Sequence, residues 1–356
     1  MKDPSLRRRR AMDALREHIQ QPKAVEYYLT RDLPSVRYFT GFTGSNATLL
    51  MSDDAPVLIT DSRYRDQAQA ETDGVSVHID RDSMAPVIAL APSSVVVDPT
   101  LPIADVDRLR DAGITALASG TALREVRAVK DADEIEQVER ACSITARALE
   151  ALHEVVAVGD SEIQIARRLE GLFADLGAED RAFATIVASG PNAAIPHHRP
   201  TDRALQPGDL MIVDCGALVG GYHADMTRTF VVSQDPEPWQ RQIHQVVLSA
   251  QQAALAAVRP GVSGSDIDHA ARSVIADAGF ADAFLHGTGH GVGLQIHEPP
   301  MLVPTSTDTL TADSPMTIEP GLYLPGRGGV RVEDTIVVGS PSRVLTDAPR
   351  DLIVVG

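Results

Sequence analysis

Four acidic residues and one histidine stand out in the C-terminal part of the chain, in segments that otherwise have the composition of β-strands: Asp214, Asp225, His290, Glu319 and Glu333. Carboxylate oxygens together with an imidazole nitrogen form a ligand set for divalent metal ions. Five such residues within otherwise apolar segments therefore predict a metal site.

The two aspartates flank a predicted β-hairpin, since the β-rich runs around Asp214 and Asp225 are separated by Gly220-Gly221. A two-residue turn at Val219-Gly220 would place Asp225 directly opposite Asp214, and a turn at Gly220-Gly221 would shift it by two residues. Because side chains alternate along a strand, both turns keep the two carboxylates on one face of the hairpin.

The two glutamates follow the same pattern around a second glycine-rich turn. A turn centred on Gly326 sets Glu319 opposite Glu333. Two carboxylates about 4 Å apart repel by roughly 4 kcal/mol at an effective dielectric near 20. Two such pairs, together with His290, are better explained by cations between them than by solvated strand residues, and four carboxylates match the charge of two divalent ions.

These segments resemble the five ligand motifs of the pita-bread metallopeptidases, a family that includes methionine aminopeptidase, Xaa-Pro aminopeptidase, Xaa-Pro dipeptidase (prolidase) and creatinase. Besides the two aspartates, the motifs are Gly287–Gly293, Ile318–Gly321 and Val332–Asp334. The resemblance implies a dinuclear site for peptide hydrolysis in which Glu319 is both a ligand and the proton shuttle. The oxygen-rich ligand set favours manganese, with cobalt or zinc as alternatives.

Five further residues match functional positions of the family: His197, His286, His297, Tyr323 and Arg331. The resemblance implies catalytic roles for His197 and His297, with the neighbouring His198 as a rival to His197. It implies substrate contacts for the other three. Arg331 shares strand parity with Glu333, so we expect both to project to one face.

The first third of the chain alternates strand and helix signals and predicts a small α/β domain at residues 1–125. The expected elements are short β-runs at Val36–Phe39, Thr48–Met51, Val57–Thr60 and Val75–Ile79, and a helix at Arg63–Glu71. Segments within it, such as Tyr38–Ser45, resemble the N-terminal domain of creatinases, prolidases and aminopeptidases P. The run Arg7–Arg10 leads into helical spacing and predicts a solvated helix start.

A long amphipathic helix at Asp131–Val156 predicts the start of a second domain, residues 126–356. This domain contains a weak internal repeat, in which Glu162-Ile163 is echoed by Asp266-Ile267 after a second helix at Pro238–Val258. The repeat agrees with the pseudo-symmetric halves of a pita-bread catalytic domain. The predicted fold class is α/β (α+β), with that domain following the small N-terminal one.

Composition excludes several classes of protein. A net charge of −17 argues against nucleic-acid and anionic-membrane partners, which require a basic surface. Two cysteines, Cys142 and Cys215, are too few for a disulfide framework, and strand alternation turns Cys215 away from Asp214. No apolar stretch is long enough to span a bilayer and the N-terminus lacks a secretory signal, so we expect a cytoplasmic protein.

We expect an Xaa-Pro aminopeptidase, which removes the residue before proline from proline-containing peptides. The alternative is a dipeptidase restricted to Xaa-Pro. A metal-free creatinase-like hydrolase and a non-catalytic binding protein also remain open, although the intact set of five ligand positions counts against both. Family habit implies a homodimer.

Overall fold

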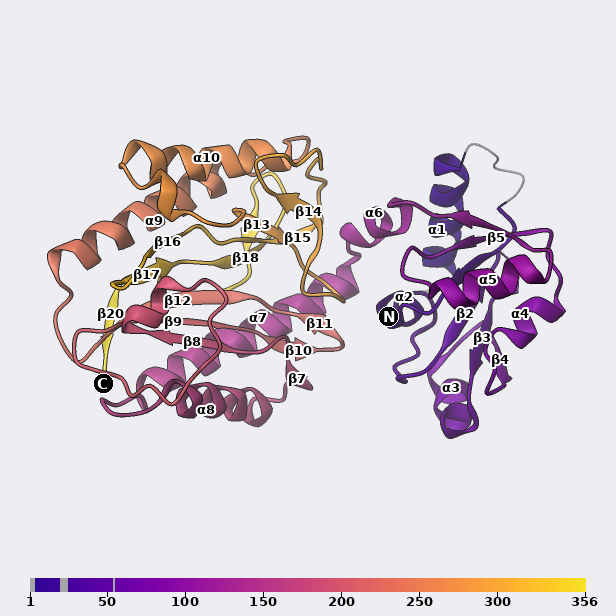
Figure 1. Cartoon of the computed structure of the whole chain (residues 1–356), viewed down its shortest axis with the longest axis horizontal. Coiled ribbons are helices and arrows are strands. Elements are labelled where there is room, and N and C mark those ends of the chain that lie inside the picture. Colours follow the sequence, from indigo (N-terminus) through magenta and orange to yellow (C-terminus); the bar gives the residue numbers. More distant parts are fainter. Residues whose placement is uncertain (1–3, 20–24, 54) are drawn as a thin grey trace. The chain divides into compact units, whose positions relative to one another are not determined.

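The chain divides into two compact units, residues 1–127 and 128–356, in a computed structural model that describes residues 4–19, 25–53 and 55–356 (Figure 1). The predicted boundary, between residues 125 and 126, falls in helix α6 (Ala122–Ala128). The fold is mixed α/β in both units.

The first unit has one mixed sheet with the strand order β4-β3-β2-β1-β5-β6 among its described residues. Its strands are β1 (Tyr28–Thr30), β2 (Thr48–Met51), β3 (Val57–Thr60), β4 (Ser76–Ile79), β5 (Ser94–Val97) and β6 (Thr115–Ala118). Its helices, besides α6, are α1 (Pro4–His18), α2 (Leu33–Thr40), the 3₁₀ turn η2 (Ser62–Tyr64), α3 (Arg65–Glu71), α4 (Ala85–Ala89) and α5 (Ile103–Asp111). The expected strands β2, β3 and β4 and the expected helix before Glu71 are confirmed.

The predicted strand at Val36–Phe39 is wrong, because this segment belongs to helix α2. The carboxylate of Asp32 caps the helix by accepting from the backbone N–H of Ser35, and Gly41, with φ of 82°, ends it. Cap signals at both ends therefore outweigh the strand propensity of the valine and aromatic residues between them.

The arginine run is only partly solvated, contrary to prediction. Arg7 and Arg8 are buried, with exposed fractions of 3% and 5%. Arg8 donates to the carbonyl of Phe39 at 2.8 Å, and the guanidinium of Arg7 lies 4.8 Å from the centre of the Tyr38 ring. These two arginines pack helix α1 onto helix α2, while Arg9 and Arg10 remain exposed.

The second unit contains two helix pairs that cover strands lying between them, α7 with α8 and α9 with α10 (Figure 1). The helices are α7 (Ala132–His153), α8 (Glu162–Asp175), α9 (Pro238–Ala257) and α10 (Gly264–Asp277), with the 3₁₀ turns η3 (Gly190–Ala194) and η4 (Ala281–Ala283). Asp131 forms a capping box with Glu134 at the start of α7. The predicted long helices are thus confirmed as α7 and α9.

The internal repeat is confirmed with a shifted alignment. Ser161 caps α8 and Ser263 caps α10, and each makes an isolated β-bridge, to Ala204 and Thr309 respectively. The offset is therefore 102 residues in the structure, so Gly264, and not the predicted Asp266, is the counterpart of Glu162.

The strands of the second unit form four sheets within the described residues: β11-β10-β7, β20-β12-β9-β8, β14-β13-β15-β18-β19 and β16-β17. They are β7 (Asp180–Arg181), β8 (Ile186–Ser189), β9 (Leu210–Cys215), β10 (Ala217–Val219), β11 (Tyr222–His223), β12 (Met226–Val232), β13 (Gly289–Gly291), β14 (Glu298–Leu302), β15 (Pro315–Ile318), β16 (Gly321–Leu324), β17 (Gly328–Arg331), β18 (Asp334–Val337), β19 (Arg343–Val344) and β20 (Ile353–Val355). A core of aliphatic side chains joins α9 and α10 to these strands, including Val247, Ile267 and Met316. The sheets thereby have one face buried against helices.

Gly216 lies against the backbone of Ala224 across the hairpin, and we predict that Gly216→Ala destabilises the protein. A Cβ at this position would lie 1.9 Å from the carbonyl oxygen of Ala224, so the backbones must separate. We expect a loss of about 2 kcal/mol or more. The matched control is Gly171→Ala within α8, where a Cβ meets nothing within 4 Å and helix propensity should add about 1 kcal/mol. Chemical denaturation of both variants measures the two effects, and equal stability would contradict the account.

Candidate metal centre

The five predicted metal ligands come from the ends and edges of neighbouring strands in the second unit. Asp214 lies in β9, Asp225 directly precedes β12, and His290 lies in β13. Glu319 follows β15 and Glu333 precedes β18. Sheet pairing therefore gathers residues that are more than a hundred positions apart in sequence.

Both predicted hairpins are present, each in a predicted register. Val219 pairs with Tyr222 across the Gly220-Gly221 turn, and the same register continues to Asp214 paired with Thr227. This is the second of the two predicted registers, with Asp225 displaced by two residues from the position opposite Asp214. In the other hairpin, the register of Gly321 with Arg331 and of Ile318 with Asp334 sets Glu319 opposite Glu333, as predicted.

Three of the five residues, Asp225, His290 and Glu333, offer ligand atoms that all lie within 4.8 Å of one another. The Nε2 atom of His290 also lies 3.4 Å from a carboxylate oxygen of Glu319. Glu333 is 1% exposed, and its Oε1 atom has no hydrogen-bond partner among the described residues; the same holds for Oδ1 of Asp214. Buried carboxylate oxygens without donors fit a site for cations.

The charges of the cluster are strongly perturbed. Burial and the neighbouring Glu333 raise the pKa of Asp225 well above its usual value, and burial and Glu319 raise the pKa of Glu333. Burial also raises the pKa of Glu319 to about 7, with Arg331 opposing this shift. Positive charge between the carboxylates would stabilise their ionised forms and so lower these pKa values again.

His290 has the form that a metal ligand requires. Burial, together with His297, lowers its pKa to about 4, so its ring is neutral near pH 7. The Nδ1 atom lies 3.1 Å from the carbonyl oxygen of Gly291 and donates to it, which leaves the lone pair of Nε2 directed at the carboxylates.

Arg331, Tyr323 and His286 form one hydrogen-bonded chain beside the cluster. A guanidinium nitrogen of Arg331 donates to Asp214 at 2.6 Å, and a second donates to the hydroxyl of Tyr323 at 2.7 Å. The tyrosine hydroxyl lies 2.8 Å from Nε2 of His286, whose Nδ1 is 2.8 Å from the carbonyl of Gly287. Burial lowers the pKa of His286 to about 4, so the neutral ring accepts from Tyr323.

Thr227 links this chain to the cluster and was not identified from sequence. Its hydroxyl donates to Glu333 at 2.6 Å and accepts from Nε of Arg331 at 3.0 Å. The signal was present, because Thr227 follows Asp225 by two residues and therefore shares its face.

The adjacent histidines His197 and His198 have different surroundings. His197 lines a cavity of about 180 Å³ and a second one of about 120 Å³, both of which also reach Asp214, His290 and Glu319. His198 is buried and its Nε2 lies 2.8 Å from Glu162. Only His197 therefore faces the cluster.

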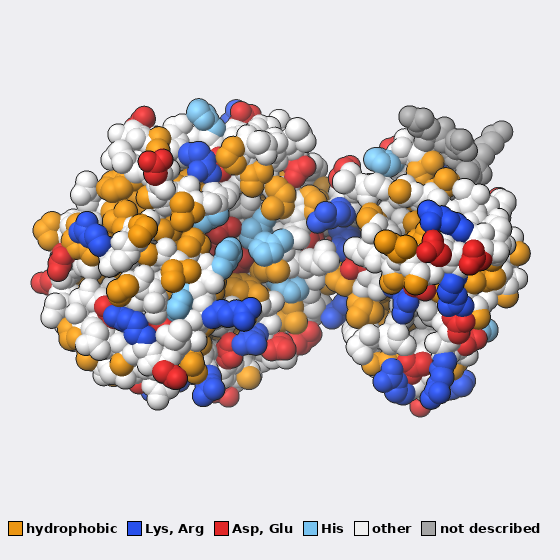
Figure 2. All heavy atoms as spheres, in the orientation of Figure 1, with side chains coloured by type: hydrophobic (Ala, Val, Ile, Leu, Met, Phe, Trp, Pro, Cys, Tyr) orange, Lys and Arg blue, Asp and Glu red, His pale blue; other side chains and the backbone are white. Residues whose placement is uncertain are grey.

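The larger cavity joins every predicted histidine to an apolar wall. Its side-chain lining is Pro196, His197, Asp214, His286, His290, His297, Met301, Val303, Glu319 and Arg331. His297 stacks edge to face on His290 at 4.4 Å between ring centres, and burial lowers its pKa. Histidine side chains gather around a hollow on this unit, with acidic side chains inside it (Figure 2).

Comparisons with known proteins agree with this arrangement. Residues 136–340 match the model of metallopeptidase family M24, and residues 11–129 match the creatinase/prolidase N-terminal domain. An Xaa-Pro dipeptidase of Pyrococcus furiosus is 40% identical over 232 residues, which cover 65% of this chain and 66% of that protein.

Solved structures that resemble nearly the whole chain include an Xaa-Pro dipeptidase and an X-Pro aminopeptidase. An Xaa-Pro dipeptidase from Bacillus anthracis superimposes with a TM-score of 0.92 at 30% identity, covering 98% of this chain and all of that one. An X-Pro aminopeptidase from Thermotoga maritima gives 0.86 at 33% identity, covering 93% and 98%.

In the described part of the chain, no helix has the length and apolarity needed to cross a membrane. The family model spans more than half of the chain, and a cluster of carboxylates with a neutral histidine lies within the matched segment. The protein therefore belongs to metallopeptidase family M24 and is a metalloexopeptidase.

Proposed function

We propose that the chain is an Xaa-Pro dipeptidase that uses two divalent ions, manganese by preference, held by Asp214, Asp225, His290, Glu319 and Glu333. The observation that carries the metal-dependent part of this proposal is the pair of buried oxygens, Oδ1 of Asp214 and Oε1 of Glu333, that lack donors among the described residues. Hydrogen bonds satisfy the other oxygens of these two side chains, from Arg331 and Thr227. Each of these two carboxylates therefore has one oxygen held by a hydrogen bond and one oxygen free to bind a cation.

Two bound divalent ions would supply an activated water and a polarised scissile carbonyl. Glu319 lines both cavities, and its side chain is 18% exposed, so it can reach both the water and the substrate. Its carboxylate would accept a proton from that water and donate it to the leaving nitrogen of proline. Arg331, bonded to Asp214, keeps that ligand in a fixed orientation.

His197 and His297 line both cavities. A neutral histidine there can donate one hydrogen bond to the substrate carbonyl as negative charge develops on its oxygen. We assign this role to His297, whose lowered pKa favours the neutral ring, and we assign to His197 the holding of the scissile region.

For substrate length, the comparisons favour a dipeptidase over the aminopeptidase that the sequence led us to expect. A relative with 40% identity and a structure with a TM-score of 0.92 are both named Xaa-Pro dipeptidase, and one structure named X-Pro aminopeptidase superimposes with 0.86. The cavity of about 180 Å³ is also small against the roughly 300–1,000 Å³ of drug-sized sites. Its wall of Pro196, Met301 and Val303 suits a proline ring.

Hydrolysis of Ala-Pro and Ala-Pro-Ala tests this function. Metal-free protein is supplied separately with manganese, cobalt and zinc, and we expect manganese to give the highest turnover of Ala-Pro and at least about ten-fold lower turnover of the tripeptide. Equal turnover of the tripeptide would make the protein an aminopeptidase. If neither peptide is cleaved with any metal, the peptidase proposal fails and a creatinase-like or binding role is revived.

Glu333→Gln should change stability in opposite directions without and with metal. Removing one of several like charges from a buried cluster should raise the Tm of the metal-free protein by a few degrees, since about 1 kcal/mol or more of repulsion is lost. The same variant should lose most of the Tm increase that manganese gives the wild type. Asp277→Asn, an exposed acid in α10, is the control. A variant that is less stable without metal would refute the repulsion argument.

His197→Ala should lower kcat for Ala-Pro by about a hundred-fold, because one interaction with the scissile region is lost. Manganese affinity should stay at the wild-type value, since His197 is not among the proposed ligands. His269→Ala, an exposed histidine in α10, controls for the substitution itself. Loss of metal binding in His197→Ala would show that the ligand set is wrong.

A further inference from the structure

Glu162 is a fully buried acid at a position where acids usually face water. It is the first residue of α8, directly after the N-cap Ser161, yet its exposed fraction is 0%. An acidic residue in the first turn of a helix normally gains from the helix dipole while its carboxylate stays solvated. Complete burial of this carboxylate requires another explanation.

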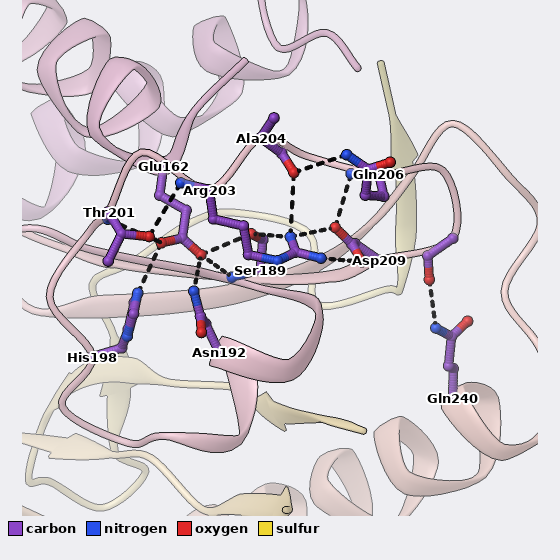
Figure 3. Close-up of polar contacts among 11 residues, drawn as sticks. Glu162, Ser189, Asn192, His198, Thr201, Arg203, Ala204, Gln206, Asp209 and Gln240 are labelled. Atoms are coloured by element: carbon purple, nitrogen blue, oxygen red, sulfur yellow. Dashed lines mark hydrogen bonds and ion pairs between the residues drawn. The ribbon is translucent and has the colours of Figure 1, made fainter. Parts of the chain in front are cut away.

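The carboxylate of Glu162 accepts six hydrogen bonds from four residues, as Figure 3 shows. Oε1 accepts from the backbone N–H and hydroxyl of Ser189, at 2.8 and 2.7 Å, and from the amide of Asn192 at 3.0 Å. Oε2 accepts from His198 at 2.8 Å, and from the N–H and hydroxyl of Thr201 at 3.0 and 2.8 Å. Both oxygens have a full set of donors.

The four donor residues lie on both sides of His197 in the sequence. Ser189 and Asn192 precede it, and His198 and Thr201 follow it. One side chain therefore closes the segment 189–201 into a loop, and His197 within this loop lines the two cavities. His198, the next residue after His197, is itself bonded to Glu162 and so anchors the loop beside His197.

The network requires an ionised carboxylate. Burial pushes the pKa of Glu162 upward, but the hydrogen bonds from Asn192, His198, Ser189 and Thr201 outweigh it and lower the pKa to about 2. No lysine or arginine in the described ranges forms an ion pair with it; the nearby Arg203 binds Asp209 and the hydroxyl of Ser189. An ionised carboxylate is an acceptor only, which matches six donors.

The corresponding position in the other half of the unit cannot hold such a side chain. With the offset given by the N-caps Ser161 and Ser263, the counterpart of Glu162 is Gly264, where a Cβ would lie 2.2 Å from the carbonyl oxygen of Met301. The buried glutamate is therefore specific to the half that carries His197.

We propose that Glu162 is a positioning residue that holds the loop 189–201 so that His197 faces the metal centre. The effect on turnover rests on the proposed function, because His197 must act on the substrate. The hold on the loop itself does not rest on it, so the two can be tested separately.

Glu162→Gln tests the proposal through its dependence on His197. A glutamine places an NH₂ group against three donors, so one arm of the loop loses its acceptor. We expect kcat/KM for Ala-Pro to fall about ten- to a hundred-fold in this variant, with manganese affinity unchanged. In a His197→Ala background the same change should cost less than about two-fold, because no histidine remains to be positioned. Equal costs in both backgrounds would overturn the proposal.

Amide hydrogen exchange gives a readout without substrate. The backbone N–H groups of Ser189 and Thr201 should exchange faster in Glu162→Gln, while those of α9 keep their wild-type rates. Unchanged exchange at Ser189 and Thr201 would overturn the proposal even if activity fell. If the wild type cleaves no Xaa-Pro peptide, the proposed function fails while this measurement still decides whether Glu162 holds the loop.

Two further variants complete the design. Glu170→Gln, on the same helix and bonded to Arg181 at 2.6 Å, should change neither turnover nor exchange. Thr201→Val removes one hydroxyl donor with little change of shape, and should lower kcat/KM about three- to ten-fold only when His197 is present. This milder variant decides the question if Glu162→Gln does not fold, and a His197-independent loss would refute the proposal.

Discussion

The main physical constraint on the catalytic unit is that its sheets hold several carboxylates close together although they repel one another. Asp225 and Glu333 are almost fully enclosed, and Asp214 and Glu319 lie beside them. Burial and mutual repulsion raise the pKa of Asp225 and Glu333, so the cluster is unfavourable by itself. The surrounding fold must be stable enough to hold such a cluster, and bound divalent ions would offset the unfavourable free energy of the crowded carboxylates.

Each histidine-bearing loop near the cluster is tied to a buried acid. Glu162 closes the loop of His197. In α10, Asp268 accepts from the N–H and hydroxyl of Thr288 and pairs with Arg272, which donates to the carbonyl of His286. Next to His297, Glu298 pairs with the buried Lys130 at 2.9 Å. Outer charges thus fix the groups that would contact substrate.

Local periodicity carried the sequence predictions that succeeded. The register of Glu319 with Glu333 followed from one turn centred on Gly326, because strand side chains repeat every two residues. The strand predicted at Val36–Phe39 is wrong, because strand propensity alone takes no account of the helix caps at Asp32 and Gly41. The role of Glu162 could not be predicted, because its partners lie 27 to 39 residues away and nothing in its own helix indicates them.

Anomalous diffraction from crystals grown with manganese can show whether this cluster binds two divalent ions. We expect two peaks, both surrounded by Asp214, Asp225, His290, Glu319 and Glu333. No peak in the cluster, or manganese bound only elsewhere on the protein, would contradict this expectation.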